Sequence, residues 1–315
     1  MTTALWIAAV VFGFALTVKA SSEAVDDATE LSRGSRLPPF FVGMTLLALG
    51  TDLPEMANSV AASFTDNGDV NVGDSIGSTT TQLTLVFGLL PFVAGKIPLG
   101  ERRSAQARGQ QTTAWITALA MLALALLLAD DHIGRLDACL LILAWIAGSR
   151  LVYRDTRTEP QLALGDKATG RLRFVGRLLL ALVLIGAGAT LAVKGMTQLA
   201  EIWGVPEFVI AFFGASIGTS LPELVVSFTA LRRGEASLAI GDVLGSSFAD
   251  ATLSISIGPL LFPTVIDGGL AVKGALVAAG AAVVVALLLG RGGEHDRRSG
   301  AILLLIYAAS WPILL

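Results

Sequence analysis

Residues 50–55 read GTDLPE and residues 218–223 read GTSLPE, so a nearly identical six-residue box occurs twice, 168 residues apart. At the same offset, GDSIGS (73–78) aligns with GDVLGS (241–246) without a gap. Self-similarity at a fixed offset is typical of chains built from repeated structural units. The sequence therefore predicts two structurally equivalent halves.

Both boxes lie in strongly apolar sequence. Of the 315 residues, 54% are hydrophobic and only 15% are charged. About 20 apolar residues cross the hydrocarbon core of a bilayer as a helix. We therefore predict an all-α polytopic membrane protein with ten transmembrane helices. They are placed near residues 3–19, 38–64, 71–94, 112–129, 134–152, 174–193, 205–231, 236–262, 268–290 and 300–315.

The basic residues predict the orientation of these helices. Nineteen of the 22 Lys and Arg residues fall in alternate connectors, and only Arg135, Lys194 and Lys273 fall in the others. Basic residues are retained on the cytoplasmic side of short loops, so we expect both termini outside.

The ten crossings divide into two groups of five. An odd number of crossings inverts the second half relative to the first, which is an architecture of secondary transporters. We expect a first five-helix repeat at 1–155, a cytoplasmic linker at 156–173 and a second five-helix repeat at 174–315.

Six acidic residues lie well inside the apolar segments, and all belong to the repeated blocks: Asp52, Glu55, Asp74, Glu223, Asp242 and Asp250. No Lys or Arg accompanies them away from the segment ends. An isolated carboxylate in hydrocarbon is costly unless it is protonated, hydrated or paired with a cation. The missing counter-charge is expected to come from solution, as metal ions or protons.

The sequence around each box suits a hard cation. Pro54 and Pro222 lack an amide hydrogen and should kink their helices, which releases backbone carbonyls. Glu55 and Glu223 follow directly, and the hydroxyls nearby belong to Thr51, Thr219 and Ser220. Carboxylate, hydroxyl and carbonyl oxygens together form the all-oxygen ligand set that calcium and sodium prefer.

The second block of each half adds further polar groups. Ser78 and Gln82 are four residues apart, as are Ser246 and Asp250, so each pair shares one face of a helix. Glycines spaced four apart, at 73 and 77 and at 241 and 245, allow close helix packing. These faces are expected to meet the kinked helices.

Two acids, Asp74 and Asp242, have an open role. Each could cap the start of its helix, or could serve ion access or proton transfer. One cysteine and two histidines exclude a Cys/His metal cluster, and no cofactor is expected.

The paired blocks GTDLPE…GDSIGSTTTQ and GTSLPE…GDVLGSSFAD resemble the alpha-repeats of the sodium/calcium exchanger family, within the calcium/cation antiporter superfamily. In this chain the alpha-repeats would span about 38–94 and 205–262. The resemblance covers the ten-helix plan of the whole chain. It implies exchange of Ca²⁺ against monovalent cations by alternating access.

The resemblance also implies metal ligands: the carboxyl or amide groups of Glu55, Glu223, Gln82 and Asp250, the hydroxyls of Thr51, Thr219, Ser220, Ser78 and Ser246, and the carbonyls of Ala48 and Ser216. This chain departs from the family at Asp52, where Ser is usual, and at Gln82, where Asn is frequent. Asp52 could strengthen a cation site, carry a proton in place of a sodium ion, or face water.

The leading prediction is a Ca²⁺/Na⁺ antiporter of the cell membrane, plasma or inner, with Ca²⁺, Na⁺ or H⁺ and membrane lipid as partners. No nucleic acid and no obligate protein partner is expected. The alternative is an antiporter of H⁺ against Ca²⁺ or another divalent cation. A remote alternative is an intramembrane aspartyl protease, but Asn71 and Ala239 stand where its Gly-Xaa-Gly-Asp signature requires glycine.

Overall fold

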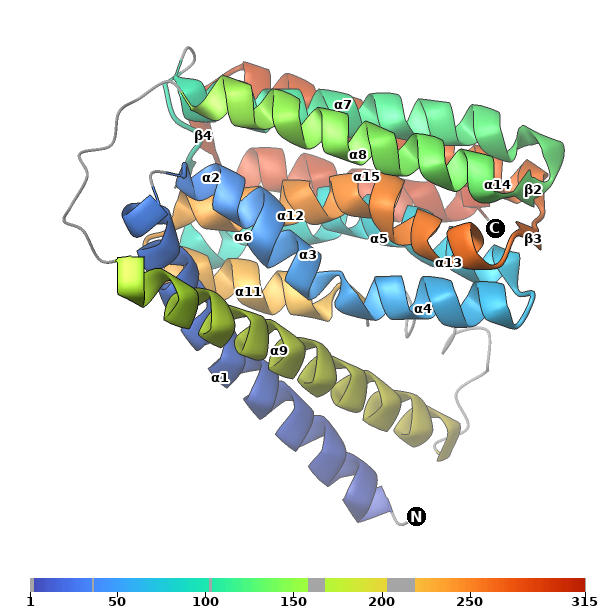
Figure 1. Cartoon of the computed structure of the whole chain (residues 1–315), viewed down its shortest axis with the longest axis horizontal. Helices are drawn as coiled ribbons and strands as arrows, with labels where there is room; N and C mark the ends of the chain where they lie inside the picture. Colours follow the sequence, from blue (N-terminus) through green and yellow to red (C-terminus); the bar gives the residue numbers. More distant parts are fainter. Residues whose placement is uncertain (1–2, 36, 102–103, 158–167, 203–218, 315) are drawn as a thin grey trace.

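The structure is a computed structural model, and it describes residues 3–35, 37–101, 104–157, 168–202 and 219–314 (Figure 1). Seven of its helices are long and apolar enough to cross a membrane, and a helix pair bent by 46° would make an eighth. The chain is therefore a multi-pass membrane protein. The count of ten crossings and the side on which the termini lie stay predictions.

The first half contains α1 (Thr3–Ser35), α2 (Pro39–Val42), the π-helical turn η1 (Gly43–Leu47), α3 (Ala48–Thr51), α4 (Leu53–Phe64), α5 (Gly68–Thr81), the π-helical turn η2 (Gln82–Val86), α6 (Phe87–Ala94), β1 (Ile97–Pro98), α7 (Ala105–Leu127), the 3₁₀ turn η3 (Leu128–Asp130), β2 (His132–Ile133) and α8 (Arg135–Thr156). The second half contains α9 (Ala168–Ile202), α11 (Leu221–Arg232), α12 (Ala236–Ala249), the π-helical turn η4 (Asp250–Ser254), α13 (Ile255–Leu261), β3 (Thr264–Val265), α14 (Gly268–Gly290), β4 (Glu294–His295) and α15 (Arg297–Leu314).

The repeated sequence blocks form the same local structure. At the offset of 168 residues, α4 matches α11, α5 matches α12 and η2 matches η4, each with identical limits. A π-helical turn is rare and often marks a functional position. Its presence directly after α5 and after α12 shows that the repeat extends to unusual backbone geometry.

Four two-residue strands connect the two halves. β1 pairs antiparallel with β4, and β2 pairs antiparallel with β3. Helix α7 runs from β1 to β2, and α14 runs from β3 to β4. Because β1 lies beside β4 and β2 beside β3, these equivalent helices run in opposite directions, as expected for inverted halves.

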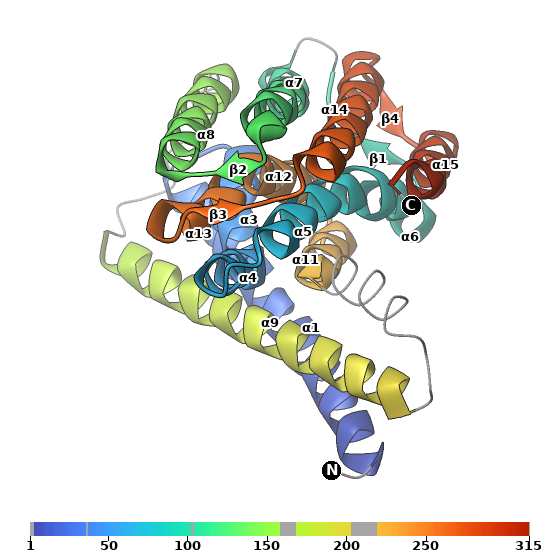
Figure 2. The ribbon, with the colours of Figure 1, turned by 90° about the vertical axis from the view of Figure 1, so that its right-hand side faces the viewer.

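Helices α1 and α9 form a long pair at one edge of the bundle, tilted against the other helices (Figures 1 and 2). They cross closely at glycines: a Cβ added to Gly13 would lie 2.5 Å from the carbonyl oxygen of Gly188. The prediction that the first helix ends near residue 19 is wrong, since α1 continues to Ser35. The continuation is polar overall, but its apolar positions share one buried face: Ala20, Ala24, Val25, Ala28 and Leu31.

The repeat helix α12 lies in the centre of the molecule and is almost wholly buried. Its glycines allow the broken helix of the first half to approach. A Cβ added to Gly241 would lie 2.4 Å from the carbonyl oxygen of Phe40, and one added to Gly245 would lie 2.4 Å from that of Met44. The predicted packing role of these two glycines is confirmed.

Candidate cation-binding site

The first box forms the predicted break in a helix. Helices ending at Thr51 and beginning at Leu53 meet at 46°, with Asp52 between them. Pro54 occupies the second position of α4, where its missing amide hydrogen is tolerated. The second box restarts in the same way: α11 begins at Leu221. In both halves the glutamate of the box therefore lies in the first turn of a new helix.

The three carboxylates of the two boxes converge. Asp52, Glu55 and Glu223 each present an oxygen within 4.8 Å of the others, and all three side chains are buried. Among the described residues, no donor makes a hydrogen bond to any of their carboxylate oxygens, and no Lys or Arg pairs with them. Three buried carboxylates this close require a positive counter-charge. The interpretation that Asp52 faces water is therefore wrong.

Predicted ligand residues of the two halves meet in cross-half pairs around this cluster. Three contacts join them: Thr51 Oγ1 to Ser246 Oγ at 3.2 Å, Ser78 Oγ to Thr219 Oγ1 at 3.2 Å, and Gln82 Nε2 donating to Asp250 Oδ2 at 3.0 Å. The remaining oxygens of Gln82 and Asp250, Oε1 and Oδ1, accept no hydrogen bond in the described part of the chain. Both have lone pairs available for a cation.

The other predicted ligands differ in what they contact. The buried hydroxyl of Ser220 has no hydrogen-bond partner among the described residues. The carbonyl oxygen of Ala48 accepts from Thr51 Oγ1 at 3.1 Å and from the Asp52 amide at 2.9 Å. Ser216 lies outside the described residues. The ligand roles of all these groups remain proposals.

The capping interpretation of Asp74 and Asp242 is wrong. Helix α5 begins at Gly68 and α12 at Ala236, so each aspartate lies more than one turn inside its helix. Asp74 accepts from Asn58 Nδ2 at 2.7 Å and from Thr219 Oγ1 at 3.2 Å.

Asp242 has a corresponding contact in the second half. It accepts from Ser227 Oγ at 2.8 Å. Ser227 lies on α11, as Asn58 lies on α4, so each aspartate joins a repeat helix to the broken helix of its own half. Neither Asn58 nor Ser227 was identified from the sequence. A signal existed for Ser227, because Ser59 occupies its equivalent position at the 168-residue offset.

Comparison with known proteins identifies the family. The sequence model of the sodium/calcium exchanger protein family matches residues 5–153 and 174–314. The chain belongs to this family. It is accordingly a membrane antiporter and not an enzyme, which removes the protease alternative.

Relatives match over nearly the whole chain. CaxA of Alkalimonas amylolytica, described as a candidate antiporter, is 27% identical over 309 residues, 95% of each chain. The sodium/calcium exchanger MaX1 of Methanosarcina acetivorans is 24% identical over 336 residues, 96% of each chain. Among solved structures, the sodium-calcium exchanger NCX_Mj superposes with a TM-score of 0.84 at 23% identity, covering 100% of both chains. This last similarity supports the fold.

Proposed function

We propose that the protein exchanges Ca²⁺ for Na⁺ across the cell membrane by alternating access. The observation that carries the proposal is the buried cluster of Asp52, Glu55 and Glu223, which the described part of the chain supplies with no cation. Hard cations prefer oxygen ligands of this kind. Ca²⁺ and Na⁺ would compete for the two glutamates, with Asp250, Gln82 and the neighbouring hydroxyls completing the shells.

Exchange requires that the site change sides only when it is loaded. An ion-free cluster of buried carboxylates would oppose closure, whereas a bound cation neutralises it. We infer that the α1–α9 pair moves against the other helices. Its glycine crossing permits sliding, and α9 already covers the break, since Leu182 lies against Gly50. The ten crossings, the two repeats at 1–155 and 174–315 and external termini belong to this proposal.

The second candidate is exchange of Ca²⁺ or another divalent cation against H⁺. It is favoured by one observation, the position of Asp52 inside the cluster. Three adjacent carboxylates bind a proton more readily than an isolated one, because each negative charge destabilises the others. A proton on Asp52 would then take the place of a sodium ion.

The test is Ca²⁺ uptake into vesicles containing the purified protein. A Na⁺ gradient and a pH gradient are applied in turn, and the Na⁺ gradient is expected to drive uptake. Uptake that follows only the pH gradient supports the second candidate, and uptake with neither gradient refutes both. Glu55→Gln and Glu223→Gln should each abolish uptake, whereas Glu101→Gln, at an exposed position, should not. Retained exchange in the first two would refute the assigned site.

A further inference from the structure

Each half has a second proline break directly after its π-helical turn. Pro91 lies inside α6 and Pro259 inside α13, at equivalent positions 168 residues apart. A proline within a helix cannot donate to the carbonyl four residues earlier. The carbonyl oxygens of Phe87 and Ile255 therefore lose their helical partners. In the interior of a membrane protein such groups must find a donor elsewhere.

In the second half, two side chains of the first half supply the donor. The Ile255 oxygen accepts from Asn71 Nδ2 at 3.0 Å and from Ser59 Oγ at 3.4 Å. Ser59 also accepts from the Gly258 amide at 3.0 Å, so it bonds to both sides of the break. Ser59 lies one turn after Glu55 on α4. The broken turn of α13 is thereby fixed to the helix that carries a proposed cation ligand.

The first half requires a different donor. The residue equivalent to Asn71 is Ala239, whose side chain has none. In its place, Nε2 of His295 lies 2.9 Å from the Phe87 oxygen. Because a carbonyl can only accept, this nitrogen carries the hydrogen. The two halves thus satisfy equivalent carbonyls with unrelated residues, an amide from a neighbouring helix and an imidazole from a distant connector.

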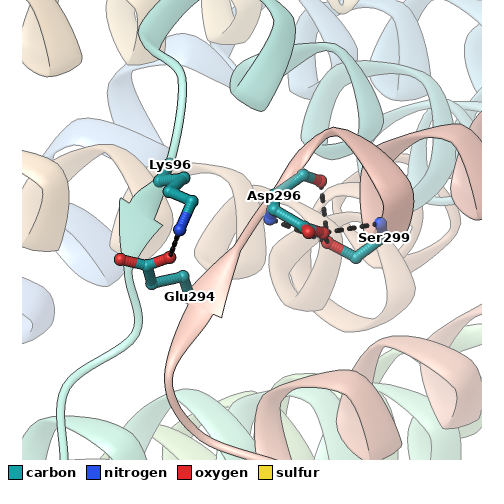
Figure 3. Close-up of polar contacts among 4 residues, drawn as sticks. All are labelled: Lys96, Glu294, Asp296 and Ser299. Atoms are coloured by element: carbon teal, nitrogen blue, oxygen red, sulfur yellow. Dashed lines mark hydrogen bonds and ion pairs between the residues drawn. The ribbon is translucent and has the colours of Figure 1, made fainter.

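The His295 ring is held from several sides. It stacks on the Phe87 ring with centroids 4.3 Å apart, and its Nδ1 lies 2.8 Å from Ser299 Oγ. Figure 3 shows the connector around it: Ser299 is bonded to Asp296. On the same strand pair, β1 with β4, an ion pair of 2.7 Å joins Lys96 and Glu294. The imidazole is buried and oriented, whereas the ion pair is exposed.

The position of the break determines where the proposed ligands point. Phe87 directly follows η2, which begins at Gln82, and Ile255 directly follows η4, which begins at Asp250. A π-helical turn contains one extra residue, so a shift of the turn by one position rotates the preceding residues by about 100°. A donor fixed to the carbonyl that ends the turn prevents this shift.

We propose that His295 is a positioning residue for Gln82, as Asn71 is for Asp250. This inference rests on the proposed function, because it assigns both targets to the cation site. The imidazole keeps η2 in register, and Gln82 is thereby held at 3.0 Å from Asp250. His295 itself contacts the end of the helix and not the ion.

Two variants separate the hydrogen bond from the ring. His295→Phe keeps an aromatic ring on Phe87 but has no donor, and His295→Gln keeps an N–H but has no ring. The control, Lys96→Ala, alters the same strand pair away from the Phe87 carbonyl. His295→Phe is expected to raise the half-saturating Ca²⁺ concentration roughly tenfold, the effect of losing one buried hydrogen bond. His295→Gln and Lys96→Ala should stay within about threefold of the parent protein.

A second measurement does not depend on transport. Amide hydrogen exchange between Gln82 and Phe92 should be faster in His295→Phe than in Lys96→Ala or His295→Gln. In a Gln82→Ala background, His295→Phe should cause no further loss of Ca²⁺ affinity. The proposal is overturned if folded His295→Phe matches the control in both measurements, if His295→Gln is equally impaired, or if the two losses add. Absence of Ca²⁺ exchange in the parent protein would refute the proposed function, and hydrogen exchange would still decide the role of His295.

Discussion

The side-chain amide of Gln82 donates to the carboxylate of Asp250 at 3.0 Å, although these residues occupy the same position in the two halves, 168 residues apart. Thr79 and Ser247 are also equivalent, and the Thr79 hydroxyl donates to the Ser247 carbonyl at 3.4 Å. Equivalent positions can touch only at the axis that relates two copies. The proposed cation site therefore surrounds the axis between the halves, with one amide facing one carboxylate at its centre.

This relationship predicts that the central pair can be exchanged. Asp250→Gln alone should lower the rate of Ca²⁺ uptake at least about tenfold, since it removes a proposed carboxylate ligand. Gln82→Asp combined with Asp250→Gln should recover most of the rate, because the axis makes the two positions interchangeable. Uptake rates of the parent, both single variants and the double variant test this. A double variant no better than Asp250→Gln would show that the surroundings of the pair differ.

Asp52 is expected to contribute negative charge to Ca²⁺ binding. Asp52→Ser restores the residue usual in the family and removes one of three clustered carboxylates. The half-saturating Ca²⁺ concentration should rise about tenfold, equivalent to about 1.4 kcal/mol, while Na⁺-driven uptake persists. Asp52→Asn, which keeps the shape without the charge, should behave like Asp52→Ser. Unchanged Ca²⁺ affinity together with loss of pH-driven uptake would instead identify Asp52 as the proton carrier.

The close approach of η1 to α12 predicts a stability defect. In Gly245→Ala the new Cβ would lie 2.4 Å from the Met44 carbonyl oxygen, so a backbone must shift. Overpacking of this kind costs about 1–3 kcal/mol. Gly280→Ala in α14 is the matched control, because a Cβ there meets nothing within 4 Å. Thermal unfolding in detergent should show a lower midpoint for Gly245→Ala alone. Equal midpoints would contradict the packing of α12 against the broken helix.

His295 predicts a pH dependence of stability. Burial lowers the pKa of its imidazole from 6.5, although the Phe87 carbonyl and Asp296 act in the opposite direction. Below pH 6.5 the unfolded chain binds a proton that the folded protein does not, so this part of the stability is lost as the pH falls towards the folded pKa. His295→Gln should remove that part of the loss.

The measurement is the unfolding midpoint of the parent and of His295→Gln between pH 7.5 and 5. Asp296 does not confuse the comparison. Its pKa is lowered from 3.8 by the Ser299 backbone amide, so its contribution disappears only as the pH falls below that value. Parallel curves for the two proteins across this range would show that His295 does not titrate as its burial predicts.

Much of the fold could be predicted because the information was local and repeated. Pro54 next to Glu55 indicates a break beside an acid, and the second copy of the box confirms the register. The polar end of α1 was missed because its buried face is narrow and its mean composition is hydrophilic. The strands were missed because two residues carry no periodic signal.

The supporting contacts could not be predicted, because their partners are distant in the sequence. His295 lies 208 residues from Phe87, and nothing near either residue indicates the other. Capping was the local explanation available for Asp74, but Asn58 on another helix accounts for it. Sequence patterns identified the charged groups that a membrane makes costly, and the groups that position them became visible only in three dimensions.

The pairing of β1 with β4 and of β2 with β3 has a consequence for biosynthesis. A ribosome completes β1 and β2 before either partner strand exists, since β3 begins at Thr264 and β4 at Glu294. The first half must therefore wait in the bilayer with both strand edges open until nearly the last helix has been made. A nascent chain halted before residue 264 is expected to depend on the insertion machinery, and its first half would not become protease-resistant by itself.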